Sequence, residues 1–230
     1  MKGSAKLSSD ERREAIIRAV RRVFAERGFH GTTTRALAEA AGVSEALLFK
    51  HFPNKEALYS AMQVFCSKER DPERMERVRA LQPSTSTLVL IVHMLVGRMV
   101  RRDCGDDEDA AILHRLMLRS MMEDGEFARI FFERSVSCWL DKVRECLEAS
   151  AAAGDAIIAP VQPRLAAIFT QHVAKSIMLA LIPPTPVVDY GMPREPLIEQ
   201  AVWFSLRGMG VRDEAIRRDY NPQALAILSG

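Results

Sequence analysis

The stretch TTTRALAEAAGVSEALLFKHFPNKEAL, residues 32–58, determines the expected fold of the N-terminal part of the chain. Its threonines precede a short alanine-rich segment that Gly42 ends, and Ser44 can cap a second short segment that Pro53 ends. Glycine permits a tight turn between two helices, so the pattern predicts a helix-turn-helix. We expect its two helices over residues 35–41 and 45–52.

The segments on either side predict two longer helices. Ser8 and Glu11 have capping-box spacing, apolar residues then recur at helical intervals, and Gly28 stands where a helix would stop. Asn54 can cap a helix that begins at Lys55. The expected helices cover residues 9–27 and 55–69.

The whole chain of 230 residues is predicted to be all-α. It is 48% hydrophobic and only 7% aromatic, and helix-forming residues dominate it. We expect two domains, a helix-turn-helix domain over 9–69 and a larger helical domain over 70–230. Residues 70–84 suggest a charged connection, and the chain is expected to end in a polar tail. Apolar and amphipathic stretches predict the remaining helices near 86–102, 110–122, 126–150, 163–182 and 195–211.

Charge is distributed unevenly along the sequence. Residues 1–63 hold 11 Lys and Arg against 7 Asp and Glu, whereas the rest of the chain is slightly acidic. A basic N-terminal module on a neutral body is compatible with a polyanionic partner, although the excess is mild.

Several classes of protein are disfavoured. The four cysteines form no CxxC pair and no cluster with histidine, so neither a disulfide framework nor a metal site is expected. Enzyme motifs such as GxSxG, HExxH and phosphate-binding glycine loops are absent, so we expect no catalytic residues and no cofactor. The longest apolar run, LVLIV before His93, is too short for a membrane span, and a cytoplasmic, nucleoid-associated protein is expected.

The motif around the predicted turn closely resembles the DNA-binding signature of the TetR family of bacterial transcriptional regulators. The shared features are the threonines, the LAxxAGVS turn, a leucine, an aromatic-x-[HY]-F box and a Lys-Glu helix start. The resemblance covers residues 9 to about 69. It implies an all-α homodimer that binds a pseudo-palindromic operator in double-stranded DNA, together with a small apolar or amphipathic effector that releases it.

The resemblance also implies the DNA-binding residues. In the family, the third helix lies in the major groove and flanking residues contact phosphates. The corresponding phosphate positions here are Thr33, Phe49, His51 and Lys55. Thr34 and Arg35, at the start of the second helix, belong to the predicted interface, although Thr33 could equally be a helix cap and Arg35 a solvated charge. The residues that face bases or nearby backbone are Ser44, Glu45, Ala46 and Lys50.

The third helix is poor in the arginine, asparagine and glutamine that usually read base edges. We interpret Leu47, Leu48 and Phe52 as its packed underside, which leaves few positions to face DNA. Two residues depart from the family pattern. Phe49 replaces the usual tyrosine and so lacks a phosphate-binding hydroxyl, and Ala46 stands where glycine is common.

The resemblance implies an effector pocket and a dimer interface within residues 70–230, and these are our least specific predictions. Methionines, aromatic residues and histidines on apolar helices are candidates for the pocket, although each could instead fill the core. The candidate effector residues are His93, Met94, His114, Met117, Phe131 and Trp139. The last two long helices pair across the dyad in the family, and the candidate interface residues are Phe169, His172, Trp203 and Phe204.

Two other functions fit parts of the sequence. One is a regulator without a small-molecule effector, controlled by a protein partner. The other is an α-helical binding or carrier protein whose basic end associates with DNA only nonspecifically. A regulator keeps a strong preference for one site, whereas a nonspecific protein binds every duplex alike.

Overall fold

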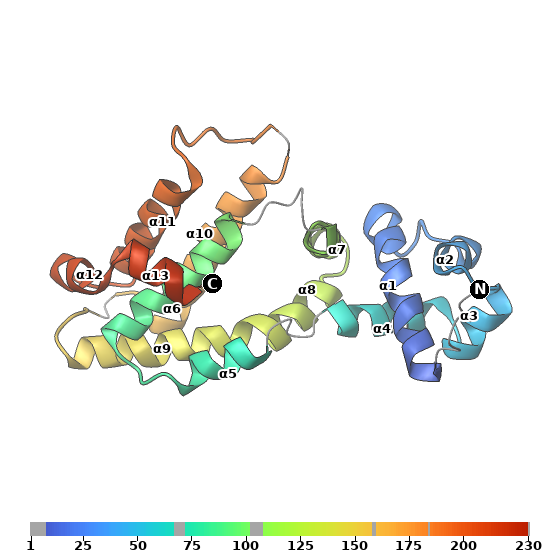
Figure 1. The fold of residues 1–230 in the computed structure, drawn as a ribbon, viewed down its shortest axis with the longest axis horizontal. Helices are drawn as coiled ribbons and strands as arrows, with labels where there is room; N and C mark the ends of the chain where they lie inside the picture. The colour runs from blue at the N-terminus through green and yellow to red at the C-terminus, as the bar shows by residue number, and fades with distance from the viewer. Residues whose placement is uncertain (1–7, 67–71, 102–107, 158–159, 184, 230) are drawn as a thin grey trace, which may run out of the picture. The chain divides into compact units, whose positions relative to one another are not determined.

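The computed structural model describes residues 8–66, 72–101, 108–157, 160–183 and 185–229. These residues form helices without a β-strand, and the only pairing of strand type among them is one isolated bridge between Ala156 and Val211 (Figure 1). The all-α prediction is confirmed. The described residues divide into two compact units, and the first of them is built from two separate parts of the sequence, residues 8–66 and 108–136.

The first unit contains the predicted helix-turn-helix. Its helices are α1 (Ser9–Arg27), α2 (Thr34–Ala41), α3 (Glu45–His51), α4 (Lys55–Cys66), α7 (Glu108–Met122), α8 (Glu126–Phe131) and the π-helical turn η1 (Phe132–Val136). The capping box at Ser8 and Glu11 is present, and α1 has the predicted bounds. Residues 67–69 of the predicted fourth helix lie outside the described residues.

The core of the first unit joins both of its parts. Phe24 of α1, Leu37 of α2 and Phe52 after α3 are buried together with Leu116 of α7 and Phe127 of α8. Helices α7 and α8 therefore complete the apolar core beneath the helix-turn-helix. The domain boundary predicted after residue 69 falls between the two parts of this unit and would assign residues 108–136 to the second domain. That boundary stays a prediction.

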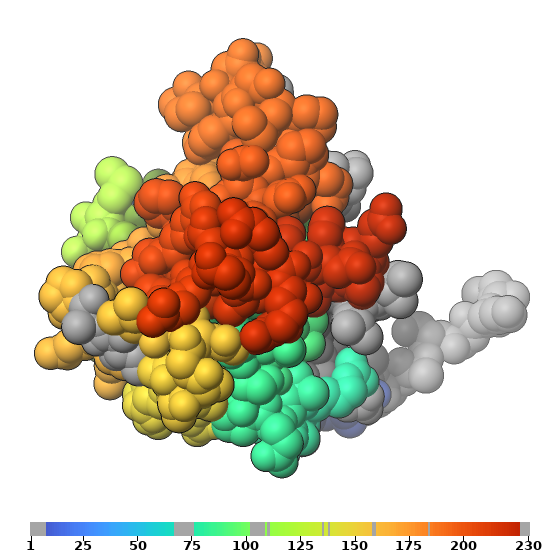
Figure 2. Space-filling view, turned by 90° about the vertical axis from the view of Figure 1, so that its left-hand side faces the viewer, coloured from blue at the N-terminus to red at the C-terminus, as the bar shows by residue number. Residues whose placement is uncertain are grey.

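The second unit is arranged around one apolar helix. Its helices are α5 (Pro72–Ala80), α6 (Thr85–Val100), α9 (Ser137–Ala152), α10 (Pro163–Leu181), α11 (Arg194–Gly208), α12 (Asp213–Asp219) and α13 (Pro222–Ser229). Helix α6 packs against α9, α10, α11, α12 and α13. Its burial on most sides confirms the prediction of a core helix. In Figure 2 the last helices, in red, cover the middle of one face, with α9 (yellow) below them.

Two segments are more ordered than predicted. The charged connection contains α5, because Val78 is buried and Lys142 of α9 donates hydrogen bonds to the carbonyls of Arg79 and Leu81 at the end of that helix. The expected polar tail contains α12 and α13. Helix α12 buries Ile216 and has acidic residues at its start and arginines at its end, which suits the helix dipole.

The acidic turn predicted from residue 103 lies outside the described residues up to residue 107. Among the helices that are described, none is long and apolar enough to cross a bilayer.

A buried histidine of α6 contacts Tyr220, the residue that follows α12, and Arg101, which pairs with α11. His93 is 1% exposed; its Nε2 lies 3.5 Å from a nitrogen of Arg101 and its Nδ1 lies 3.4 Å from the hydroxyl of Tyr220. Arg101 also pairs with Glu195 of α11, at 2.8 Å. Because arginine can only donate, Nε2 must accept and the proton must be on Nδ1. Burial, followed by the charge of Arg101, lowers the pKa of His93.

We predict that His93 makes the stability of the protein fall in mild acid. A histidine whose pKa is lower in the folded state binds its proton first in the unfolded chain, so stability is complete above the unfolded pKa of about 6.5 and is lost as the pH falls below it. Urea unfolding from pH 8 to pH 5 should therefore show a shallower loss of unfolding free energy for His93→Gln than for the unmodified protein. His30→Gln, at an exposed position, is the control; identical pH profiles for His93→Gln and the unmodified protein would contradict the prediction.

Candidate nucleic-acid interface

Local hydrogen bonds fix the ends of the two helices in the helix-turn-helix. The hydroxyl of Thr33 accepts from the Ala36 amide at 3.2 Å, and the hydroxyl of Ser44 accepts from the Leu47 amide at 3.2 Å. Between them Gly42 has a φ of +63°, in the left-handed region that favours glycine. Both hydroxyls are thus helix caps in this structure.

Helix α3 has one buried face and one exposed face. Leu48 and Phe52 are buried and Leu47 is half-buried, which confirms the predicted underside. The opposite side is open to solvent and includes Phe49, whose side chain is 41% exposed. The predicted base-facing residues are all exposed: Ser44, Glu45, Ala46 and Lys50.

Two carboxylates near this surface are held by neighbouring side chains. The hydroxyl of Thr34 donates to Glu45 at 2.8 Å, which joins the start of α2 to the start of α3. Arg35 pairs with Glu39 at 3.0 Å along the exposed side of α2. Glu45 therefore has a preferred orientation before any partner arrives, and Arg35 has an acidic neighbour that a phosphate would have to replace.

Lys55 is engaged within the first unit. Its ammonium donates to the carbonyls of Phe29 and Thr32, at 3.0 Å each, and lies 4.2 Å from the centre of the Phe29 ring. These contacts hold the connection between α1 and α2. The sequence predicts a phosphate contact at this position but gives no sign of the two carbonyls, which are 26 and 23 positions away.

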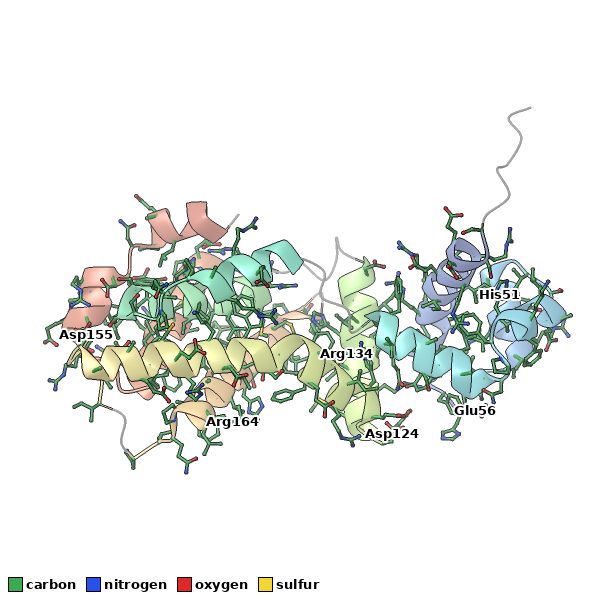
Figure 3. All side chains as sticks on the ribbon, turned by 90° about the horizontal axis from the view of Figure 1, so that it is seen from below. His51, Glu56, Asp124, Arg134, Asp155 and Arg164 are labelled. Atoms are coloured by element: carbon green, nitrogen blue, oxygen red, sulfur yellow. The ribbon has the colours of Figure 1, made fainter. Side chains whose placement is uncertain are left out.

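The C-terminal end of α3 is held by a residue that the sequence does not single out. Arg13 of α1 donates to the carbonyl of His51, the last residue of α3, and its guanidinium lies 4.1 Å from the centre of the Phe52 ring. His51 itself is half-buried at this edge of the unit (Figure 3). The two partners are 38 positions apart, and no local pattern joins them.

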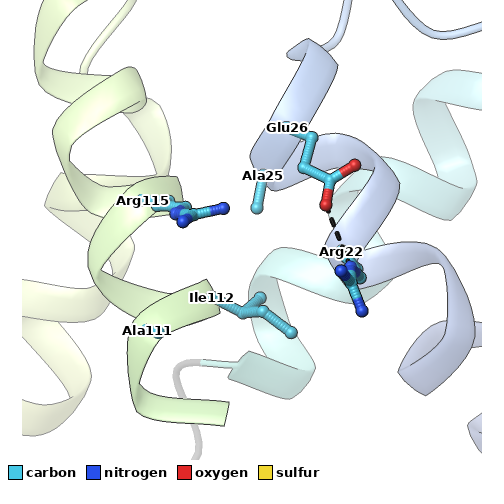
Figure 4. A pocket seen from close by; sticks show the side chains of 6 residues that line it. All are labelled: Arg22, Ala25, Glu26, Ala111, Ile112 and Arg115. Carbon is cyan, nitrogen blue, oxygen red and sulfur yellow. Dashed lines mark hydrogen bonds and ion pairs between the residues drawn. The ribbon is translucent and has the colours of Figure 1, made fainter. Parts of the chain in front are cut away.

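A small pocket lies between α1 and α7 in the first unit. It has a volume of about 130 Å³ and is lined by Arg22, Ala25, Glu26, Ala111, Ile112 and Arg115 (Figure 4). The hydrogen bond from Arg22 lowers the pKa of Glu26, with smaller help from the charge of Arg115. The pocket is well below the several hundred Å³ that a drug-sized molecule fills.

The predicted effector residues are divided between the two units. His114 and Met117 of α7 and Phe131 of α8 belong to the first unit, where Met117 and Phe131 pack against its core. The others belong to the second unit: His93, Met94 and Trp139. His93 and Met94 are buried in the core, and Trp139 is half-buried.

Three of the four predicted interface residues are exposed. Phe169 of α10 is 53% exposed, Phe204 of α11 is 66% exposed, and His172 is also open to solvent. Trp203 is half-buried and lies beneath the guanidinium groups of Arg207 and Arg217.

Comparison with known proteins shows what the N-terminal part of the chain is similar to. Residues 16–62, which run from within α1 to within α4, match the model for bacterial regulatory proteins of the tetR family. The helix-turn-helix segment of this chain is therefore similar to that of tetR-family regulatory proteins. The match covers the packed underside and the exposed face of α3, so the predicted DNA-binding residues lie inside it.

The chain is also similar to known regulators over longer stretches than this match. The chain is 32% identical over 134 residues to the HTH-type transcriptional repressor Rv1474c of Mycobacterium tuberculosis, covering 56% of this chain and 63% of that protein. It is 32% identical over 152 residues to the regulatory protein RaaS of the same organism, covering 66% and 61%. The matched part thus spans less than two thirds of each relative.

The fold is also that of a solved regulator. The structure of AibR in complex with isovaleryl coenzyme A and operator DNA superposes with a TM-score of 0.60 at 21% identity, covering 84% of this chain and 97% of that one. At this level of identity the likeness establishes the fold alone.

We predict that Lys55→Ala lowers the stability of the first unit by about 1–3 kcal/mol, because two carbonyls lose their charged hydrogen-bond donor. Urea unfolding measures the difference. Lys50→Ala removes the same charge from an exposed side chain and serves as the control. Equal unfolding free energies for both variants would mean that the Lys55 contacts contribute nothing to stability.

Proposed function

We propose that the protein is a DNA-binding transcriptional repressor that a small apolar or amphipathic effector releases from its operator. The observation that carries the proposal is helix α3. Its apolar side is anchored in the core by Leu48 and Phe52, while its polar side is open to solvent. A helix presented in this way can enter the major groove of B-DNA, which is wide enough for an α-helix.

Each exposed residue has a chemical role in this proposal. Glu45 can accept from the amino group of cytosine, and its bond to Thr34 orients it for that contact. Ala46 can contact a thymine methyl or permit close approach, and Lys50 can reach a base or phosphate. Residues around the helix-turn-helix contact phosphates, which fix register and supply affinity without sequence information. These flanking residues are Thr33, Thr34, Arg35, His51 and Lys55. Ser44 faces the bases or the nearby backbone, and Phe49 occupies a phosphate position of the family without the hydroxyl that would bind it.

Release by an effector requires a link from a ligand site to α3, and α7 supplies one. Arg21 of α1 pairs with Asp109 of α7 at 2.7 Å, and Leu113 and Leu116 pack in the common core. His114 and Met117 lie on the same helix, so a ligand that moved α7 would strain its contacts with α1. The ligand must bind the DNA-free arrangement more tightly, because equal affinity for both arrangements shifts nothing.

The relatives support this mode of action. Rv1474c is a repressor by name, and AibR has been solved with both a coenzyme A thioester and operator DNA. We extend the effector-responsive mechanism to this chain on the strength of the shared fold. The proposal places the protein in the cytoplasm, on the nucleoid, and assigns it no enzymatic activity and no cofactor.

A homodimer is part of the same proposal. One helix-turn-helix reads few base pairs, so two copies related by a two-fold axis are needed to read a longer site. The exposed phenylalanines on α10 and α11, Phe169 and Phe204, are the apolar side chains that we place in the interface, and His172 and Trp203 accompany them.

We predict that the protein selects one pseudo-palindromic site from a pool of random duplexes, with half-sites about one helical turn (~34–36 Å) or a multiple of it apart. Glu45→Ala should change the preferred base pairs in each half-site, because it removes the oriented acceptor. Glu14→Ala removes an exposed carboxylate from α1 and should leave the selected site unchanged. Failure to enrich any site, with the same salt dependence for all duplexes, would favour nonspecific association instead.

We also predict that Phe204→Ser weakens dimerisation at least about 100-fold, because each dimer loses two buried aromatic side chains worth roughly 1.5–3 kcal/mol each. Sedimentation over a range of protein concentrations measures the dissociation constant. The control is Met122→Ser on α7, since Met122 is an apolar side chain that is 88% exposed in the first unit. A dimer of unchanged strength in Phe204→Ser would remove this side chain from the interface.

A further inference from the structure

The C-terminal end of α3 would be repelled by the phosphates of a DNA groove. The last carbonyls of a helix lack partners within it, and this end carries partial negative charge. An α-helix with its side chains is about as wide as the major groove, so phosphates lie close to a helix that enters it. The end of α3, at His51, would therefore repel the DNA backbone unless a cation stood beside it.

Arg13 is the cation that stands there. It donates to the carbonyl of His51, and its guanidinium stacks at 4.1 Å from the centre of the Phe52 ring. The hydrogen bond satisfies a terminal carbonyl, while the ring supports the flat face of the guanidinium. Together these contacts hold a positive charge at the end of α3, although Arg13 belongs to the first turns of α1.

The guanidinium retains the capacity to bind an anion. It carries five N–H donors in a rigid fork, and the bond to His51 uses one of its nitrogens. The Arg13 side chain is exposed, and no carboxylate among the described residues pairs with it. Arg18, Arg21 and Arg22 on the same helix differ in this respect, because each pairs with an acidic residue.

The internal contacts of Lys55 leave a place for a second cation that could bind a phosphate in this region. It is the predicted phosphate contact of this region, but its ammonium already serves the carbonyls of Phe29 and Thr32. A phosphate contact from Arg13 would supply positive charge without breaking the hydrogen bonds of Lys55 to these two carbonyls.

We propose that Arg13 binds a DNA phosphate beside the C-terminal end of α3, while its hydrogen bond to His51 fixes the position of that end. The proposal rests on the proposed function, because it assumes that α3 lies in the major groove. It assigns one residue two linked roles: a phosphate contact that raises affinity for every duplex, and a support for the helix that reads the sequence.

The test compares four proteins: the unmodified chain, Arg13→Gln, Arg13→Lys and Arg18→Gln. Binding is measured by fluorescence anisotropy on a duplex of about 30 base pairs of random sequence and on a site selected by the unmodified protein, over salt concentrations from about 50 to 300 mM. Arg18→Gln is the matched control, since it removes an exposed arginine further along α1, roughly 140° around the helix. Circular dichroism melting establishes that each variant is folded.

Loss of one phosphate contact has a defined signature. Arg13→Gln should reduce the magnitude of the slope of log K against log salt by about 0.9 on both duplexes, which corresponds to roughly eightfold weaker binding at about 0.1 M salt. Arg18→Gln should leave the slope unchanged. Arg13→Lys should keep most of the slope, because the charge remains. It should lower the ratio of the affinity for the selected site to that for the random duplex, because an ammonium lacks the fork that spans carbonyl and phosphate.

The outcomes separate the two proposals. Weaker binding by Arg13→Gln with an unchanged salt slope would mean that Arg13 only positions α3, and would overturn the phosphate contact. If Arg13→Gln is unfolded, Arg13→Lys decides the matter: affinities for both duplexes equal to those of the unmodified protein, and so an unchanged preference for the selected site, would mean that no guanidinium fork spans carbonyl and phosphate, and would overturn the proposal. If the unmodified protein prefers no site, the proposed function fails, whereas the salt slope of Arg13→Gln on the random duplex still decides the phosphate contact.

Discussion

A seven-residue helix cannot hold its own shape, and the whole helix-turn-helix depends on how α3 is anchored. Isolated helices of this length are marginal in water, because nucleation costs more than so few hydrogen bonds return. The burial of Leu48 and Phe52 in the shared core supplies the missing stability. This constraint explains why α3 is so apolar, and it limits the residues that can face DNA to those of one exposed side.

Several lysine and arginine side chains donate hydrogen bonds to backbone carbonyls within the protein, which reduces their availability to other molecules. Lys55 holds the connection after α1 and Lys142 holds the end of α5, whereas Arg13 holds the end of α3 with one of its nitrogens and keeps other donors. In each case a charged group satisfies backbone acceptors where helical hydrogen bonding stops. The basic character of the N-terminal segment is therefore partly structural, so its net charge overstates the charge available to a polyanion.

Features set by neighbouring residues were predictable from the sequence, and those set by distant residues were not. The capping box at Ser8, the turn at Gly42 and the buried side of α3 follow from spacing within a few positions. The bonds of Lys55 and Arg13 join residues 23 to 38 positions apart and have no local signature. Helix α5 could not be predicted because its stability comes from the burial of Val78 and from a lysine in α9. The DNA-contacting and effector residues stay predictions.

The discontinuous core of the first unit also limits how such proteins can exchange parts. The family signature lies within residues 16–62, yet Leu116 and Phe127, far along the chain, fill the same core as Phe24 and Phe52. A recombination that swapped only the N-terminal segment between two regulators would set a new α1 against an unmatched α7. Substitutions in the two segments should then compensate one another during evolution, and a functional chimaera would need to carry residues 108–136 along with the helix-turn-helix.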